Sequence, residues 1–198
     1  CYLVLLKWLI LMCLHPLSLM LPFMTENLLV ATHLETDRES FKMRPERIED
    51  LFRRAVAQLD RRAAEHHISV HLEDAALMAT MNARLIERVI INIMNNAIQY
   101  TPKGSHIELR GTKKGNAVEI RVTDDGPGIS DDAKRHLFDL FYTARQEKAD
   151  CQRGLGLGLN LCQSIVAMHG GKIDVLDHVP NGTAFQFALP LVSPEAGR

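Results

Sequence analysis

The sequence predicts an α+β two-layer sandwich, in which a mixed, mostly antiparallel sheet is covered on one face by helices. One sign is a hairpin: strands at 106–113 and 117–124 flank Lys114-Gly-Asn116, a turn sequence that favours adjacent antiparallel strands. The other is a pair of amphipathic helical segments, 46–67 and 82–99, whose apolar residues repeat with helical spacing. Such helices bury their apolar stripe by packing on the apolar face of a sheet.

The chain has the size and composition of one globular domain with a tail. Its 198 residues suffice for a buried core, and 46% hydrophobic with 24% charged residues is typical of a folded protein. A net charge of −1 gives no basic surface, so we expect no nucleic acid partner. The four cysteines (1, 13, 151 and 162) lack metal-ligand spacing, which favours reduced thiols.

The first 25 residues form an apolar segment of open status. Residues 1–24 are long enough to span a membrane as a helix, but Pro16 and Pro22 would kink or break the second half. A buried segment that seeks a partner, or an irregular truncated end, is favoured over a native membrane helix. Because the chain begins with Cys1, we expect a fragment of a longer protein.

Helices are expected where apolar residues recur every three or four positions between capping signals. Pro45 is a favourable residue just before the second helix, and Asn82 caps the third. Gly170-Gly171 ends the last one. The expected helices are Asn27–Glu35, Glu46–His67, 82–99, a short one near 131–139 and 156–169.

Strands are expected where apolar and polar residues alternate. Val118, Ile120 and Val122, for example, share one face of their strand. The last two strands form a closing hairpin around Pro180-Asn-Gly182. The expected strands are Ile68–Leu72, one near 77–80, 106–113, 117–124, Lys172–Asp177 and Thr183–Leu189.

Two asparagines on the long helix are candidate metal ligands. Asn92 and Asn96 are four residues apart, so they project from the same face. Amide oxygens are hard ligands suited to Mg²⁺, which takes its other ligands from water and phosphates. A pair of surface amides is the simpler interpretation for two asparagines alone. Asparagine is a poor residue inside a helix, however, and two on an otherwise apolar helix favour a functional role.

A glycine-containing loop, Asp124-Asp-Gly-Pro-Gly128, directly follows a strand. A carboxylate held at a strand end can accept a hydrogen bond from the exocyclic amine of adenine, which guanine lacks at that position. Gly126 and Gly128 let the backbone approach a ring and adopt dihedral angles closed to other residues. Taken alone, this loop is more simply an ordinary Asp-Gly turn.

Glycines also precede the last helix, in Gly154-Leu-Gly-Leu-Gly158, where backbone N–H groups at a helix N-terminus can hold phosphate oxygens. The motif is neither a Walker A loop nor a good dinucleotide fingerprint, and alone it indicates a flexible loop. Phe138-Asp-Leu-Phe141 and these glycines bracket a polar stretch, 142–153, which carries Arg145. A polar stretch in this position is suited to act as a lid over bound nucleotide, although a solvated loop is the simpler interpretation.

In this order the four segments resemble the N, G1, F and G2 boxes of the sensor histidine kinases, over residues 47–190. That family belongs to the GHKL superfamily, which it shares with gyrase and mismatch-repair ATPases and which has the Bergerat ATP-binding fold. The stretch from Phe141-Tyr-Thr-Ala-Arg145 to Arg153–Leu159 looks most like the Kdp-type potassium-responsive sensor kinases.

The resemblance implies a division of the chain. Asn27–Glu35 looks like the end of the second helix of the family's dimerisation domain, so 26–37 would be a remnant of it and 38–46 a linker. Residues 47–190 would form the catalytic ATP-binding domain, and 191–198 a tail.

The resemblance implies ATP and Mg²⁺ as ligands. Asn96 should ligate the metal with help from Asn92. Asp124 should read adenine, and Tyr100 should line the base pocket. The other nucleotide-binding positions that it implies are Gly126, Gly128, Arg145, Gly154, Gly156, Gly158 and Thr183.

The implied activity is that of a protein histidine kinase. The γ-phosphoryl group of ATP would pass to a histidine outside this fragment, on the protein's own dimerisation domain within a homodimer, and then to an aspartate of a response regulator receiver domain. The whole would be a membrane-anchored bacterial sensor kinase, with this domain in the cytoplasm. Related hydrolases carry a glutamate as general base where this chain has Asn92, which favours transfer over rapid hydrolysis.

Two departures from the family pattern keep alternatives open. Gln99 stands where many of these kinases have lysine, so another cation, from Lys103 or the lid, must replace that charge. No phosphoacceptor motif is present, since neither His15 nor His33 lies in the expected context. A degenerate, non-catalytic nucleotide-binding or interaction module and an anti-sigma-type serine kinase are the alternatives.

Overall fold

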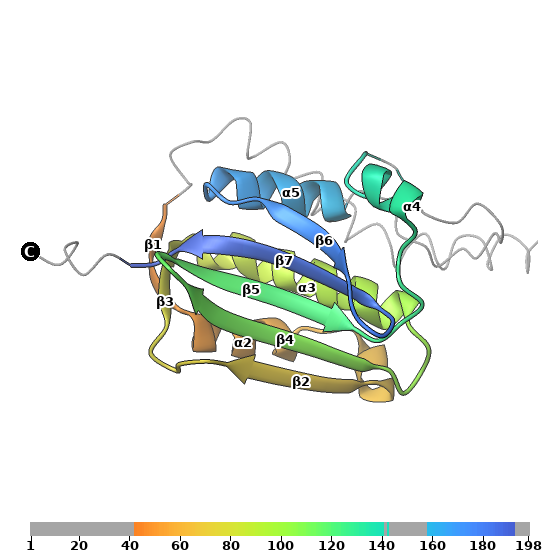
Figure 1. Cartoon of the computed structure of the whole chain (residues 1–198). Coiled ribbons are helices and arrows are strands. Elements are labelled where there is room, and N and C mark those ends of the chain that lie inside the picture. Colours follow the sequence, from red (N-terminus) through yellow and green to blue (C-terminus); the bar gives the residue numbers. More distant parts are fainter. Residues whose placement is uncertain (1–41, 141, 143–157, 193–198) are drawn as a thin grey trace, which may run out of the picture.

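The computed structural model describes residues 42–140, 142 and 158–192 (Figure 1). These residues form a sheet with helices packed on it, in an order close to that expected. The elements are β1 (Arg44–Arg47), α2 (Ile48–Ala57), the 3₁₀ turn η1 (Arg61–Glu65), β2 (His67–Leu72), β3 (Met78–Met81), α3 (Ala83–Tyr100), β4 (His106–Lys114), β5 (Ala117–Asp124), α4 (Asp131–His136), α5 (Gly158–Met168), β6 (Ile173–Asp177) and β7 (Thr183–Pro190).

The main sheet has five strands in the order β2-β4-β5-β7-β6 (Figure 1). Strands β2 and β4 are parallel, and every other neighbouring pair in this sheet is antiparallel. Helix α3 packs between α2 and α5 and contacts the middle of the sheet. The predicted α+β two-layer sandwich, with its mixed and mostly antiparallel sheet, is confirmed.

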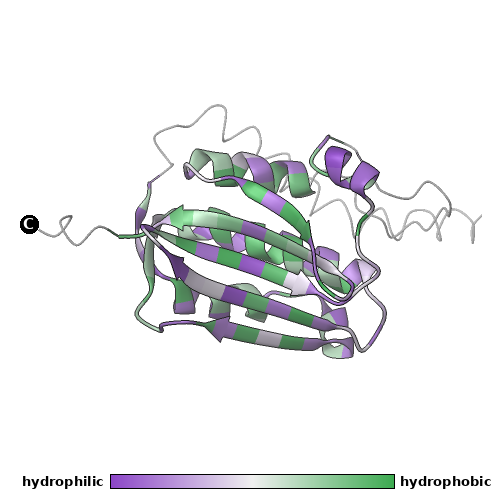
Figure 2. Cartoon of the chain, viewed as in Figure 1, coloured by the Kyte–Doolittle hydropathy of each residue, from purple (hydrophilic) through white to green (hydrophobic). Residues whose placement is uncertain are grey.

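The core lies between the helices and one face of the sheet. Val118, Ile120 and Val122 of β5 are at most 2% exposed, as their alternation predicts. Figure 2 shows the same alternation of hydrophobic and hydrophilic residues along the central strands. Burial of apolar side chains between α3 and the sheet favours folding. The fully buried apolar residues that α3 contributes are Ile86, Val89, Ile90, Ile93 and Met94.

Both predicted hairpins are present, and the second one lies beside Asp124. Strands β4 and β5 turn at Lys114 and Ala117, while β6 and β7 turn where Asp177 faces Thr183. Because β7 also pairs with β5, Thr183 at the start of β7 lies opposite Asp124 at the end of β5. Pairing between distant strands thus brings the closing hairpin to the Asp124 loop.

The predicted helix over 46–67 is wrong at both ends. Arg44–Arg47 is a strand that pairs with β3 in a separate two-stranded sheet, and helix α2 begins only at Ile48. Helix α2 ends at Ala57 and is followed by η1, where the Asp60 side chain accepts a hydrogen bond from the Arg62 N–H. An aspartate that bonds the backbone in this way competes with continued helix.

The predicted cap of the long helix is confirmed. The Asn82 side chain accepts a hydrogen bond from the Leu85 N–H at 3.3 Å, and the backbone N–H of Asn82 donates to His169 Nε2 at 3.0 Å. The other ring nitrogen, Nδ1, lies 2.7 Å from the Ile165 carbonyl oxygen. The imidazole is therefore neutral with its proton on Nδ1, and it joins the end of α5 to the start of α3.

The predicted segments 1–25, 26–37 and 191–198 lie wholly or mostly outside the described residues. Among the residues that are described, no helix is both long and apolar enough to cross a membrane.

Candidate functional site

The first asparagine of the N box, Asn92, contacts α5. Asn92 is 4% exposed, and its Nδ2 donates to Cys162 Sγ at 3.7 Å. Its Oδ1 is buried and has no hydrogen-bond partner within the part of the chain that the structure describes. Asn96, one turn further along, is half-buried. A buried acceptor without a partner is costly, so Asn92 Oδ1 is suited to a group that binds there.

The N-terminus of α5 lies directly against Asn92. A Cβ built on Gly158, the first residue of α5, would be 3.9 Å from both Asn92 Cγ and Nδ2. The structure therefore brings Gly158 to Asn92, which is predicted to assist the metal ligand Asn96, and N–H groups at a helix N-terminus favour phosphate. Cys162 lies one turn further along α5 and contacts the same asparagine, a contact that sequence reasoning missed.

The F box is tied to the same helix. Asn160 Nδ2 donates to the Phe138 carbonyl oxygen at 2.9 Å. The start of α5 thus holds the segment that leads into residues 141–157, of which only 142 is described. Phe141, Arg145, Gly154 and Gly156 lie outside the described residues, and the predicted roles of these four stay predictions.

Asp124 ends β5 and is 7% exposed. The Gly126 N–H donates to its Oδ1 at 3.0 Å. Burial raises the pKa of this carboxyl, while the Gly126 and Thr183 N–H groups act in the opposite direction. A carboxylate with little water around it and one oxygen committed to the backbone is a strong acceptor for a donor on a ligand.

The loop after Asp124 is packed too closely for side chains at the predicted glycine positions. A Cβ on Gly126 would lie 2.6 Å from Thr101 Cγ2, so this loop rests against the turn after α3. Gly128 has a φ of +76°, a conformation that other residues rarely adopt. The close approach to Thr101 thus explains Gly126, and the positive φ explains Gly128.

One of the other predicted nucleotide-binding residues lies beside Asp124. Thr183 is 4% exposed and faces Asp124 across the β5–β7 pair. Tyr100 is the last residue of α3 and is 55% exposed. It immediately precedes Thr101, which lies against the Gly126 loop, and its role in a base pocket stays a prediction.

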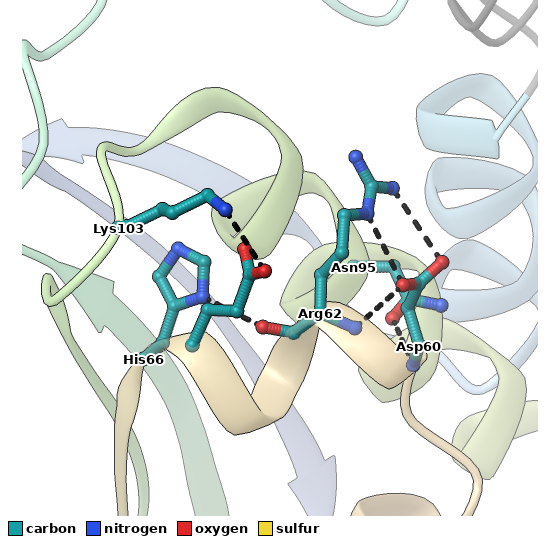
Figure 3. A network of polar contacts seen from close by, with 6 residues as sticks. Asp60, Arg62, His66, Asn95 and Lys103 are labelled. Carbon is teal, nitrogen blue, oxygen red and sulfur yellow. Dashed lines mark hydrogen bonds and ion pairs between the residues drawn. The ribbon is translucent and has the colours of Figure 1, made fainter.

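Lys103 is one of the two sources suggested for the charge that Gln99 lacks. Its Nζ lies 2.9 Å from Glu65 Oε1, on the turn that joins α3 to the sheet (Figure 3). Figure 3 also shows Asp60, whose backbone N–H donates to Asn95 Oδ1 at 3.1 Å. These contacts attach η1 to α3. The Lys103 side chain is 78% exposed, so this surface ion pair does not commit it, and Lys103 and the lid both stay predicted sources of the cation.

A profile of the family described as histidine kinase-, DNA gyrase B-, and HSP90-like ATPase matches residues 81–193. The chain belongs to this family. The match spans α3, the Asp124 loop, α5 and the closing hairpin, and it confirms the predicted histidine kinase type of ATP-binding domain.

Among curated relatives, the sensor protein KdpD of Clostridium acetobutylicum is 37% identical over 165 residues, which cover 83% of this chain and 18% of the relative. KdpD of Escherichia coli is 32% identical over 123 residues, covering 62% of this chain and 14% of the relative. The predicted likeness to Kdp-type kinases is confirmed. The chain spans less than a fifth of either protein.

Solved structures agree with the fold. The catalytic domain of histidine kinase ThkA superposes with a TM-score of 0.66 at 26% identity, covering 75% of this chain and 95% of that domain. Full-length ShkA in complex with AMPPNP has a TM-score of 0.70 at 23% identity and covers 83% of this chain and 34% of that one, a likeness of fold. The predicted Bergerat-type architecture is thus confirmed.

Proposed function

We propose that this domain binds ATP with its adenine at Asp124 and its phosphates between α3 and the start of α5. The observation that carries the proposal is the Asn92 amide, which is buried against Gly158 with an oxygen that no described residue satisfies. Asp124 supplies a second buried acceptor, and the loop that follows it lies against Thr101, directly after the end of α3. Two buried acceptors, one near each end of the N-box face, suit one extended ligand.

The residues present fit a magnesium ion. Asn96 and Asn92 would offer amide oxygens as ligands from the protein. The ATP phosphates would supply ligands from the nucleotide. A bound Mg²⁺ would neutralise charge on the transferring phosphoryl group.

The residues of the N box favour transfer over hydrolysis. Asn92 cannot act as general base for water, because a neutral amide does not accept a proton near neutral pH. Its neighbour Cys162 is no general base either, because burial raises the pKa of that thiol to about 12 and the thiol is a donor at neutral pH. The domain would therefore hold ATP until a protein nucleophile arrives, with catalysis by positioning and charge neutralisation.

In the whole protein, the nucleophile would be a histidine on the protein's own dimerisation domain, and the phosphoryl group would pass on to a receiver-domain aspartate. A complex of ThkA with the response regulator TrrA is among the similar folds. We infer that the whole protein is a homodimeric, membrane-anchored kinase with this domain in the cytoplasm, and that it responds to potassium as Kdp-type sensors do.

Phosphotransfer to a separate acceptor tests this activity. We expect the chain, mixed with radiolabelled ATP, Mg²⁺ and the dimerisation domain of a Kdp-type kinase, to label the acceptor on histidine but not itself. Histidine phosphoramidate is acid-labile and base-stable, which separates it from phosphoserine. Serine labelling would favour the anti-sigma-type kinase, and ATP binding without any labelling would favour the degenerate module.

A further inference from the structure

The turn between β6 and β7 is bonded to the loop that follows Asp124. Asn181 Nδ2 donates to the Asp125 carbonyl oxygen at 2.9 Å and to the Gly126 carbonyl oxygen at 3.4 Å. Asn181 itself is exposed and is separated from these partners by more than fifty positions. No motif in the sequence points to this contact.

One peptide group joins this contact to the Asp124 carboxylate. The Asp125 carbonyl oxygen, which accepts from Asn181, belongs to the same planar peptide unit as the Gly126 N–H. That N–H donates to Asp124 Oδ1 at 3.0 Å. Because the peptide unit is rigid, holding its oxygen also fixes the direction of its N–H. Asn181 therefore sets the direction from which Asp124 Oδ1 is held.

The neighbouring glycine shows how closely the turn is seated on the loop. Gly182 has a φ of +121°, and a Cβ built on it would lie 1.9 Å from the Asp124 carbonyl oxygen. Its own carbonyl oxygen accepts from the His178 N–H at 3.1 Å, which closes the turn. The turn therefore lies in direct contact with the loop and can transmit a constraint to it.

We propose that Asn181 is a positioning residue that sets the nucleotide's base selectivity, by orienting the peptide unit that holds Asp124. This inference rests on the proposed role of Asp124 as the acceptor for the adenine amine. The Gly126 N–H holds Oδ1, and the Thr183 N–H also bonds the carboxyl group. Rotation of the peptide unit would release Oδ1 and misdirect both oxygens. A guanine base, which has no amine at that position, would gain nothing from the alignment.

Titration of the full chain with AMPPNP and GMPPNP, for wild type, Asn181→Ala and Asn181→Asp, tests the proposal. Loss of the amide donor should weaken AMPPNP binding about three- to tenfold and leave GMPPNP binding unchanged. Asn181→Asp preserves the shape but places a carboxylate against two carbonyl oxygens, so it should act at least as strongly. Asn116→Ala, an exposed asparagine in the other hairpin turn, is the matched control.

Hydrogen exchange of the Gly126 amide, followed by NMR without nucleotide, gives an independent readout. It should speed up in both Asn181 variants and not in the control. Equal loss of AMPPNP and GMPPNP affinity, or unchanged base selectivity with unchanged exchange, would overturn the positioning role. The Asp124→Ala variant separates the two hypotheses: if it also leaves selectivity unchanged, the adenine assignment itself is wrong.

Discussion

At the scale of single residues, the buried carboxylate of Asp124 is suited to binding a ligand but lowers the stability of the fold. Burial raises the pKa of its carboxyl, so the folded state binds a proton more tightly than the unfolded state, where the pKa is about 3.9. Stability from this group is therefore fully present below the unfolded pKa and is lost as the pH rises through the folded value. At neutral pH the ionised carboxylate costs stability, which is the expected mark of a residue kept for binding.

Replacing this carboxylate with an amide should separate binding from stability. In Asp124→Asn the amide oxygen can still accept from Gly126, but the remaining NH₂ group would face the adenine amine. We expect AMPPNP affinity to fall about tenfold or more, while the thermal midpoint without nucleotide stays equal or rises. Calorimetric titration and a thermal melt at neutral pH measure both. Unchanged affinity in a folded variant would contradict the adenine role.

We propose that Asn96 holds the metal ion. In Asn96→Ala we expect nucleotide binding to become insensitive to Mg²⁺, because the amide oxygen that completes the ion's coordination is lost. The control is Asn95→Ala, since the neighbouring Asn95 side chain instead accepts a hydrogen bond from the Asp60 N–H. Titrations with and without Mg²⁺ that differ as in wild type would rule out Asn96 as a ligand.

The residues that carry local chemistry could be predicted, and their long-range partners could not. Helical spacing alone places Asn92 and Asn96 on one face. The contact of Asn92 with Cys162 crosses seventy positions, and that of Asn181 with Asp125 crosses fifty-six. Such contacts depend on the packing of α5 and the closing hairpin, which no local pattern encodes.

At the scale of elements, capping residues decided which boundaries could be predicted. Asn82 caps α3 where expected. The helix predicted over 46–67 instead ends at Ala57, because Asp60 caps the separate turn η1. Pro45 preceded a helix by pattern but lies in strand β1, because residues 44–47 pair with β3 instead. Pairing with a distant strand overrode the local signal there.

Removing the cap of α3 should have a measurable cost. Asn82→Ala deletes the side-chain acceptor of the Leu85 N–H and should lower the free energy of unfolding by about 1 kcal/mol. Urea denaturation measures this, with the exposed Asn116→Ala as control. A loss no larger than that of the control would show that the cap contributes nothing.

The His169 bridge between α5 and α3 predicts a pH dependence of stability. Burial lowers the pKa of His169, so the folded state binds this proton less tightly than the unfolded state. The contribution of neutral His169 to stability is therefore fully present above the unfolded-state pKa of about 6.5. It is lost as the pH falls from 6.5 toward the lower pKa of the folded state. Wild type should therefore lose stability in that window.

In His169→Gln the loss of stability in this window should be smaller than in wild type, because the titrating group is gone. The free energy of unfolding at several pH values on both sides of the window measures the difference. Parallel pH profiles for the two proteins would contradict the bridge's role.

At the scale of the whole molecule, alternation and turn signals predicted the sandwich, both hairpins and the covering layer. They did not predict that β1 and β3 form a separate sheet joined to the chain after β7, where Ala79 bridges Leu191. They also left open the pairing partner of β2, which is β4 in parallel register. Parallel and non-sequential pairing depends on the assembled layers rather than on any single segment.

In our proposal Asp124 and the asparagine pair belong to one site, and magnesium-dependent binding of an adenine nucleotide is the central claim. The most direct test is calorimetric titration of the full chain with AMPPNP, with and without Mg²⁺, beside GMPPNP. We predict AMPPNP binding that Mg²⁺ strengthens and that GMPPNP does not match. Absence of binding by a folded sample, or equal binding of the two nucleotides, would contradict the claim.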